Sequence, residues 1–103
     1  MKNYVVNVEP EALADIQDIT DWYNEVQNNL GKKFQNQVVK QINSLIKDPQ
    51  IHAIRYKSIR CMLVKKFPYM VHFYINEETI VVEVLSVIST DRNPKVGEGK
   101  TSK

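Results

Sequence analysis

The chain has 103 residues, of which 43% are hydrophobic and 25% are charged, with only 3 Gly and 4 Pro. This composition predicts one globular domain and excludes a loop-rich or disordered protein. The single cysteine, Cys61, excludes an intramolecular disulfide and a cysteine-based metal cluster. No apolar run approaches the roughly 20 residues of a membrane span, and the acidic start does not resemble a signal peptide. We therefore expect a cytoplasmic protein with no membrane partner.

The net charge of +2 conceals an uneven distribution along the chain. Residues 1–31 carry one Lys against six acids, a net −5, whereas residues 32–76 carry nine Lys or Arg against one Asp, a net +8. Residues 77–103 carry four bases against five acids, a net −1. A basic block of this size suggests an anionic partner, either nucleic acid or an acidic protein segment. The alternative is a solvated basic face that keeps the protein soluble.

The N-terminal half predicts a short strand followed by a helix. Residues 4–8 are rich in β-branched side chains, and Pro10 suits the first position of a helix. Apolar residues then recur at spacings of three and four, at Ala12, Ile16, Ile19, Tyr23 and Val26. The acids outside that set should face water, namely Asp15, Asp18, Asp21 and Glu25. Gly31 suits a left-handed helix end.

A second amphipathic helix follows, and Asp48-Pro49 ends it. Its apolar face consists of Phe34, Val38, Ile42, Leu45 and Ile46. Two such helices with a short connection predict an antiparallel hairpin. Their striped faces need another apolar layer, and we expect them to pack against Leu85 or Val87 of a sheet.

That sheet is predicted from three apolar segments, residues 59–67, 69–75 and 79–88, after a loop at residues 50–58. The reversals are Phe67-Pro68-Tyr69 and Asn76-Glu77-Glu78. Short turns between consecutive strands indicate an antiparallel meander. The predicted fold is therefore α+β with the order β-α-α-β-β-β: a helical hairpin packed on a small antiparallel sheet. One domain should cover residues 1–96, with a flexible tail at residues 97–103.

This order of elements, filled with these residues, resembles the RelE/ParE family of toxins from bacterial type II toxin–antitoxin systems, over roughly residues 3–95. The resemblance is carried by "PEALADIQDITDWYNE", "LGKKFQNQVVKQINSLIKDP", "IRCMLVKKFPYMVHFYI" and "VLSVISTDRNP". The third segment is closer to the ParE-like branch. The resemblance implies a toxin held silent in a complex with a cognate antitoxin. It also implies that the toxin acts on DNA gyrase, as in the ParE branch, or cleaves messenger RNA on the ribosome, as in the RelE branch.

A ribonuclease of this family would need a base, an acid and cations around the phosphate. The candidates for the catalytic set are Arg60, Lys66 and Arg92, with Lys65 and His72 as further basic groups. Strand alternation would place Arg60 and Lys66 on one face. Against this activity, Ser89 and Asp91 stand near where many members carry basic groups, and Met70 or Val71 stands where RelE-like enzymes carry an arginine. Binding to gyrase is therefore the favoured hypothesis, with a ribonuclease or a non-toxic family member as alternatives.

Basic and aromatic side chains are the candidates for partner binding. They are Trp22, Lys32, Lys33, Lys65, Lys66, Phe67 and Tyr69. Lysines at the start of a helix oppose its dipole, which favours a binding use for Lys32 and Lys33. His72, between apolar neighbours, is expected to be a hydrogen-bonded sheet residue. His52 has no second ligand at metal spacing, so we predict neither a metal nor a cofactor.

Overall fold

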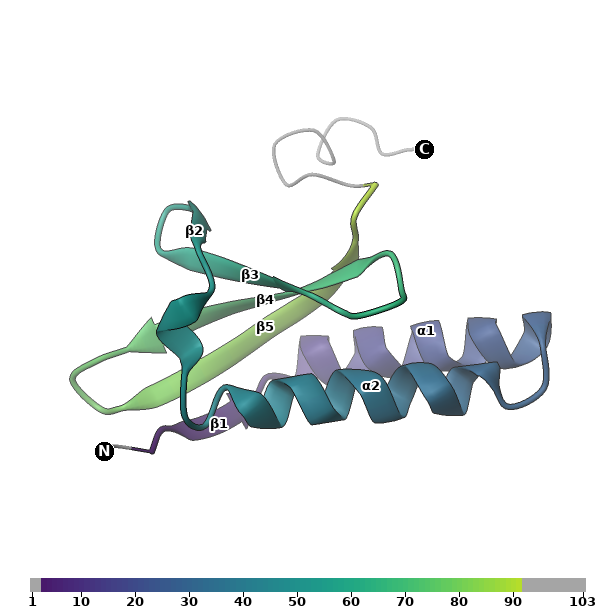
Figure 1. The fold of residues 1–103 in the computed structure, drawn as a ribbon, viewed down its shortest axis with the longest axis horizontal. Helices are drawn as coiled ribbons and strands as arrows, with labels where there is room; N and C mark the ends of the chain where they lie inside the picture. Colours follow the sequence, from purple (N-terminus) through teal and green to yellow (C-terminus); the bar gives the residue numbers. More distant parts are fainter. Residues whose placement is uncertain (1–2, 92–103) are drawn as a thin grey trace.

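Two helices and a five-stranded sheet form the two layers of the fold in a computed structural model that describes residues 3–91 (Figure 1). In chain order the elements are β1 (Val5–Val8), α1 (Pro10–Val26), α2 (Leu30–Ser44), the 3-10 turn η1 (Pro49–Ile51), β2 (Ile54–Tyr56), β3 (Ile59–Leu63), β4 (Tyr69–Asn76) and β5 (Val81–Ser89). The sheet order is β1-β5-β4-β3-β2. β1 pairs with β5 in parallel, and the other pairs are antiparallel. The predicted α+β fold and element order are confirmed, but the parallel pair of β1 with β5 makes the sheet mixed rather than antiparallel throughout.

Two segments of the sheet differ from the prediction. The expected loop at residues 50–58 contains β2, a three-residue strand on the edge of the sheet. The strand expected to reach residue 67 ends at Leu63, because Lys66 adopts a left-handed backbone with φ of 73°. The amide of Val64 donates to the carbonyl of Tyr69 at 2.9 Å, so the reversal occupies residues 64–68. Both lysines before Phe67 therefore lie in a turn rather than in a strand.

The helical hairpin forms as predicted, but its connection is built differently. Asn29, not Gly31, adopts the left-handed backbone, with φ of 71°. Gly31 lies in the first turn of α2, where its amide donates to Oδ1 of Asn24 at 2.8 Å. A Cβ atom at Gly31 would lie 2.2 Å from the carbonyl oxygen of Thr20. Glycine is needed here for the close approach of two helices, not for a helix end.

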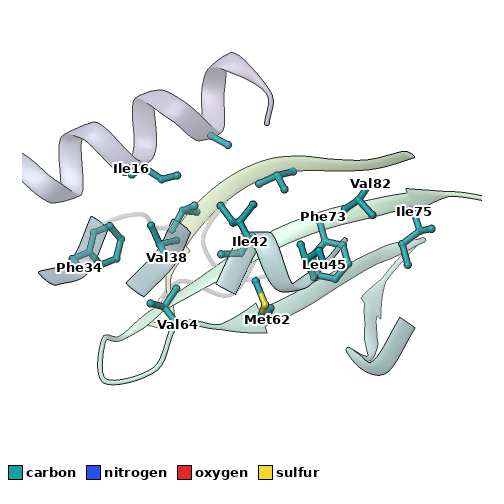
Figure 2. Close-up of a cluster of buried hydrophobic side chains, with 14 of the residues drawn as sticks. Ile16, Phe34, Val38, Ile42, Leu45, Met62, Val64, Phe73, Ile75 and Val82 are labelled. Atoms are coloured by element: carbon teal, nitrogen blue, oxygen red, sulfur yellow. The ribbon is translucent and has the colours of Figure 1, made fainter. Parts of the chain in front are cut away.

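The core lies between the hairpin and the helix-facing side of the sheet (Figure 2). Its largest fully buried side chains are Phe34, Val38, Leu45, Val64, Val71, Phe73, Val82 and Val84. The predicted stripes are confirmed for both helices, except that Val26 is 59% exposed. Of the two predicted sheet contacts, Val87 belongs to the core. Leu85 lies at a bulge, since Ser86 pairs with His72 and Val84 with Phe73.

Asp15 does not face water as expected. It is half-buried, and its Oδ2 accepts the amide of Val87 at 2.9 Å. β1 pairs with β5 only as far as Val84, so this carboxylate replaces a strand partner further along β5. Burial, together with the nearby acids Glu11 and Asp18, raises the pKa of Asp15 above its ordinary value of 3.8, although the bond from Val87 opposes the shift.

Two substitutions of Asp15 should distinguish its effect as a hydrogen-bond acceptor from the effect of its buried charge on stability. Asp15→Ala leaves the Val87 amide without its acceptor, which typically costs about 1–3 kcal/mol. Asp15→Asn keeps an acceptor without the buried charge and should match or exceed the native stability at neutral pH. Because the folded-state pKa is raised, the folded chain binds the proton more strongly than the unfolded chain. The stability of the native protein, compared with that of Asp15→Asn, should therefore fall as pH rises from 3.8 through the raised pKa. Urea unfolding across that range measures the difference, and a native stability that instead rises would contradict it.

Candidate partner-binding groove

A groove lies between α2 and the turn that joins β3 to β4. Gln41 holds the two sides together: its Nε2 donates to the carbonyl of Leu63 at 2.6 Å, and its Oε1 accepts the amide of Lys65 at 2.7 Å. Gln37, one turn earlier on α2, donates to the same Oε1 at 2.7 Å. The position of the β3–β4 turn relative to the helix is therefore fixed by hydrogen bonds to its backbone.

The groove consists of two adjoining hollows along α2, of about 690 Å³ and about 580 Å³. Both hollows are lined by Gln37, Lys40 and Lys66. Four lysines line the pair of hollows: Lys33 and Lys40 from α2, and Lys65 and Lys66 from the turn. Within residues 3–91 no acidic side chain lines either hollow. We call this feature the basic groove.

Apolar groups lie among these lysines. They are Leu30 and Phe67 in the first hollow and Ile51 and Met62 in the second. Met62 is buried in the core, whereas Ile51 is 76% exposed. A surface that combines cations with accessible apolar side chains fits a segment that is both acidic and amphipathic.

His52 closes the η1 end of the basic groove without adding a charge near neutral pH. Burial lowers the pKa of its imidazole, and the nearby guanidinium of Arg60 lowers it further. The ring packs edge-on against Phe73, with centroids 5.8 Å apart. The positive potential of the basic groove therefore comes from its lysines.

The structure brings together four of the seven candidate binding residues, namely Lys33, Lys65, Lys66 and Phe67. Lys32 is exposed but lines neither hollow. Lys40, Ile51 and Met62 were not expected at this site. Of these, Lys40 could have been found, because it lies seven residues, or two helical turns, after Lys33.

Of the three aromatic candidates for partner binding, two pack against the core and one is exposed away from the basic groove. Phe67 and Tyr69 are half-buried against Phe34 and Tyr23, with ring centroids 5.3–6.2 Å apart, so they are core residues more than free anchors. Phe67 still lines the edge of the basic groove. Trp22 is 55% exposed, as a binding residue would be, but it lies on α1 and does not line the basic groove.

The catalytic candidates do not gather in one place. Nη1 of Arg60 donates to the carbonyl of His52 at 2.7 Å and to that of Gln50 at 3.2 Å. Lys66 lies six residues along the chain, in the turn beyond the other end of β3. The expectation that alternation would place Arg60 and Lys66 on one face is wrong, because the strand ends before Lys66. The third candidate, Arg92, lies outside the described residues.

Cys61 and His72 form a cross-strand pair on the face of the sheet away from the helices. The sulfur lies 3.5 Å from Nδ1 of His72, and the hydroxyl of Tyr56 lies 3.0 Å from the same nitrogen. His72 is 3% exposed, which confirms the expectation of a hydrogen-bonded sheet histidine. Burial raises the pKa of the Cys61 thiol and lowers that of the His72 imidazole, so both are neutral near pH 7. An activated thiolate is not favoured here.

Among residues 3–91, no three His, Cys, Asp or Glu side chains are grouped so that they could hold a metal ion. Neither helix of this part of the chain has the length and apolar character needed to cross a membrane.

Comparisons with known proteins agree with the fold. Residues 6–94 match the model of the family described as the ParE toxin of the type II toxin–antitoxin system parDE. No curated protein sequence matches significantly. Among solved structures, the chromosomal ParDE system of P. aeruginosa is similar at 18% identity, with a TM-score of 0.74, covering 84% of this chain and 95% of that one.

Two RelE structures are also similar. The intact E. coli RelBE toxin–antitoxin complex matches at 19% identity and a TM-score of 0.63, covering 84% of this chain and 95% of that one. The isolated E. coli RelE toxin matches at 18% identity and a TM-score of 0.64, with 92% and 93% covered. At these identities the structural similarity establishes the fold. Since the family model spans nearly all of the described residues, the chain belongs to the family of ParE toxins of type II toxin–antitoxin systems.

Proposed function

We propose that an acidic, amphipathic segment of a cognate antitoxin occupies the basic groove and holds this toxin inactive. The observation that carries the proposal is the groove itself, where Lys33, Lys40, Lys65 and Lys66 surround apolar side chains. Two similar solved structures, the P. aeruginosa ParDE system and the E. coli RelBE complex, belong to toxin–antitoxin systems. An antitoxin is therefore the expected partner of this chain.

The charges and the apolar groups of the basic groove should contribute differently to binding. Exposed ion pairs typically contribute only about 0–1 kcal/mol each, so the lysines act mainly on the rate and the salt dependence of association. Affinity must come from apolar side chains of the antitoxin that cover Leu30, Ile51 and the edge of Phe67. Association should therefore be fast and salt-sensitive, with dissociation controlled by the apolar contacts.

A charge-reversal pair tests the location of the site. Lys33→Glu with Lys40→Glu should slow association with the antitoxin by roughly tenfold or more and flatten its dependence on salt. Lys32→Glu with Lys47→Glu is the matched control, because it changes the net charge equally at two exposed lysines outside the basic groove. Stopped-flow association at several ionic strengths measures the effect. An equal slowing by the control would show that overall charge, rather than this groove, attracts the antitoxin.

We also propose that the target is DNA gyrase and that the toxin acts by binding rather than by cleaving RNA. Membership of the ParE family supports this reading. So does the engagement of Arg60, whose guanidinium donates to the backbone carbonyls of Gln50 and His52. A ribonuclease would need Arg60 to leave these carbonyls, or Lys66 to act without it.

The gyrase proposal has a direct test. Purified toxin in excess should block supercoiling of relaxed plasmid by gyrase, and prior mixing with the antitoxin should restore it. The matched control is the preformed toxin–antitoxin complex at the same toxin concentration. Supercoiling that continues at high excess, together with cleavage of translated messages in expressing cells, would replace this proposal with the ribonuclease alternative.

A further inference from the structure

A second surface has the features that the basic groove is expected to bind. The outer side of α1 carries the exposed acids Asp18, Asp21 and Glu25 next to two exposed apolar side chains, Trp22 and Val26. Trp22 is 55% exposed and Val26 is 59% exposed. We call these five residues the α1 stripe. It is an acidic, amphipathic helix face that stays largely exposed in the described part of the chain.

The α1 stripe and the basic groove lie on opposite flanks of the helical hairpin. A Cβ atom at Gly31 would lie within 2.7 Å of Thr20 and Asn24, so these two residues face α2. At 100° per residue, Trp22 lies roughly 160–200° around α1 from both. Lys33 lies roughly 200° around α2 from Gly31 by the same rule. One molecule therefore cannot bring its own stripe to its own groove.

The spacing of charges matches between the two surfaces. Lys33 and Lys40 are seven residues apart on α2, and Asp18 and Glu25 are seven residues apart on α1. Each pair spans two helical turns, or about 10 Å. If α1 of one molecule lay beside α2 of another, both pairs could meet at once. Trp22 and Val26 would then reach the apolar side chains of the basic groove.

We propose that a second copy of this chain places its α1 stripe in the basic groove, so that toxin without antitoxin associates head to tail. The inference rests on the proposed function, because it uses the same groove. Such a contact is heterologous: a pair of copies keeps one free groove and one free stripe, so association continues with concentration. The antitoxin and the second copy compete for one surface, and antitoxin therefore disperses the assemblies.

Two variants with opposite charge reversals test the contact. One changes Asp18 and Glu25 to Lys, and the other changes Lys33 and Lys40 to Glu. All four positions are exposed, and circular dichroism checks that both variants fold. In sedimentation velocity the native chain should associate with concentration and dissociate with salt. Each variant alone should associate roughly tenfold more weakly, whereas an equal mixture should recover association, because each reversed surface then meets its complement.

Further arms keep the two proposals separate. The control Lys32→Glu with Lys47→Glu should associate like the native chain. The Asp18→Lys, Glu25→Lys variant keeps its groove and should bind antitoxin with native affinity. A native chain that stays monomeric, or a mixture that does not recover, overturns the self-association while leaving antitoxin binding to that variant intact. If the variant with Asp18→Lys and Glu25→Lys loses antitoxin binding although its groove is native, the antitoxin does not bind at the groove alone, and the proposed antitoxin site is wrong.

Discussion

Replacing Gly31 by alanine is expected to destabilise the protein by about 1–3 kcal/mol, the usual cost of forcing atoms into a packed site. In most helices the same change is favourable by about 0.5–1 kcal/mol, because alanine restricts the unfolded chain and favours the helix. Here the added Cβ would lie 2.2 Å from the backbone oxygen of Thr20 and 2.6 Å from Cγ of Asn24. Asn24 can rotate, but only by giving up its bond to the Gly31 amide. The carbonyl of Thr20 can move only if α1 moves away from α2.

Lys32→Ala is the control for this effect, because it introduces alanine one residue later in the same turn at an exposed position. Its stability should stay within about 0.5 kcal/mol of the native value. Urea unfolding of both variants gives the comparison. A Gly31→Ala protein at least as stable as the native chain would show that the helices are further apart than the structure places them.

Truncating Phe34 to alanine should cost about 3–5 kcal/mol, the largest loss expected from any single substitution here. The ring is fully buried and lies 5.3–5.7 Å, centroid to centroid, from the rings of Tyr23, Phe67 and Tyr69. It therefore joins α1, α2 and the β3–β4 turn in one aromatic cluster. Removing it leaves a cavity that these partners from separate elements cannot fill by small movements. Since small domains are stable by only about 5–15 kcal/mol, the variant should be partly unfolded at 37 °C.

Removing the Phe34 ring should also alter the basic groove, because Phe34 packs against Phe67 and Phe67 lines the groove. The antitoxin is expected to dissociate faster from the folded fraction of the variant than from the native protein. Val39→Ala is the control: it lies on the same helix, its side chain is 47% exposed, and its stability should stay near native. Thermal unfolding followed by circular dichroism measures both variants. A Phe34→Ala midpoint close to that of Val39→Ala would mean that the cluster is not packed as described.

The helices were predictable from sequence because their apolar residues keep a period near 3.6 over about three turns, as from Ala12 to Tyr23. β2 was not, because three residues at a sheet edge show no usable alternation. The end of β3 was missed for a different reason. Val64 is buried and continues the alternating pattern of the strand, while the left-handed backbone at Lys66 leaves no mark in the side-chain types.

The site was predictable only in part, since most of it depends on distances across the fold. Lys33, Lys65 and Lys66 could be chosen for their charge, but their convergence follows from the hydrogen bonds that Gln41 makes to the turn. The pairing of Cys61 with His72 needs the register of β3 against β4, which the sequence does not specify. Arg60 was chosen for its charge, and only the structure shows its guanidinium held by backbone carbonyls.

The bond from Val87 to Asp15 has a consequence for solubility. Strand edges without a partner are templates for pairing between molecules and hence for aggregation. Within residues 3–91, no strand pairs with β5 beyond Val84 on the β1 side, which leaves residues 85–89 as such an edge. Asp15 accepts the hydrogen bond of the Val87 amide and places a carboxylate where an incoming strand would lie. The opposite edge, β2, is only three residues long. The acidic helix α1 thus protects the sheet from adding foreign strands during the time that a toxin of this kind spends without its antitoxin.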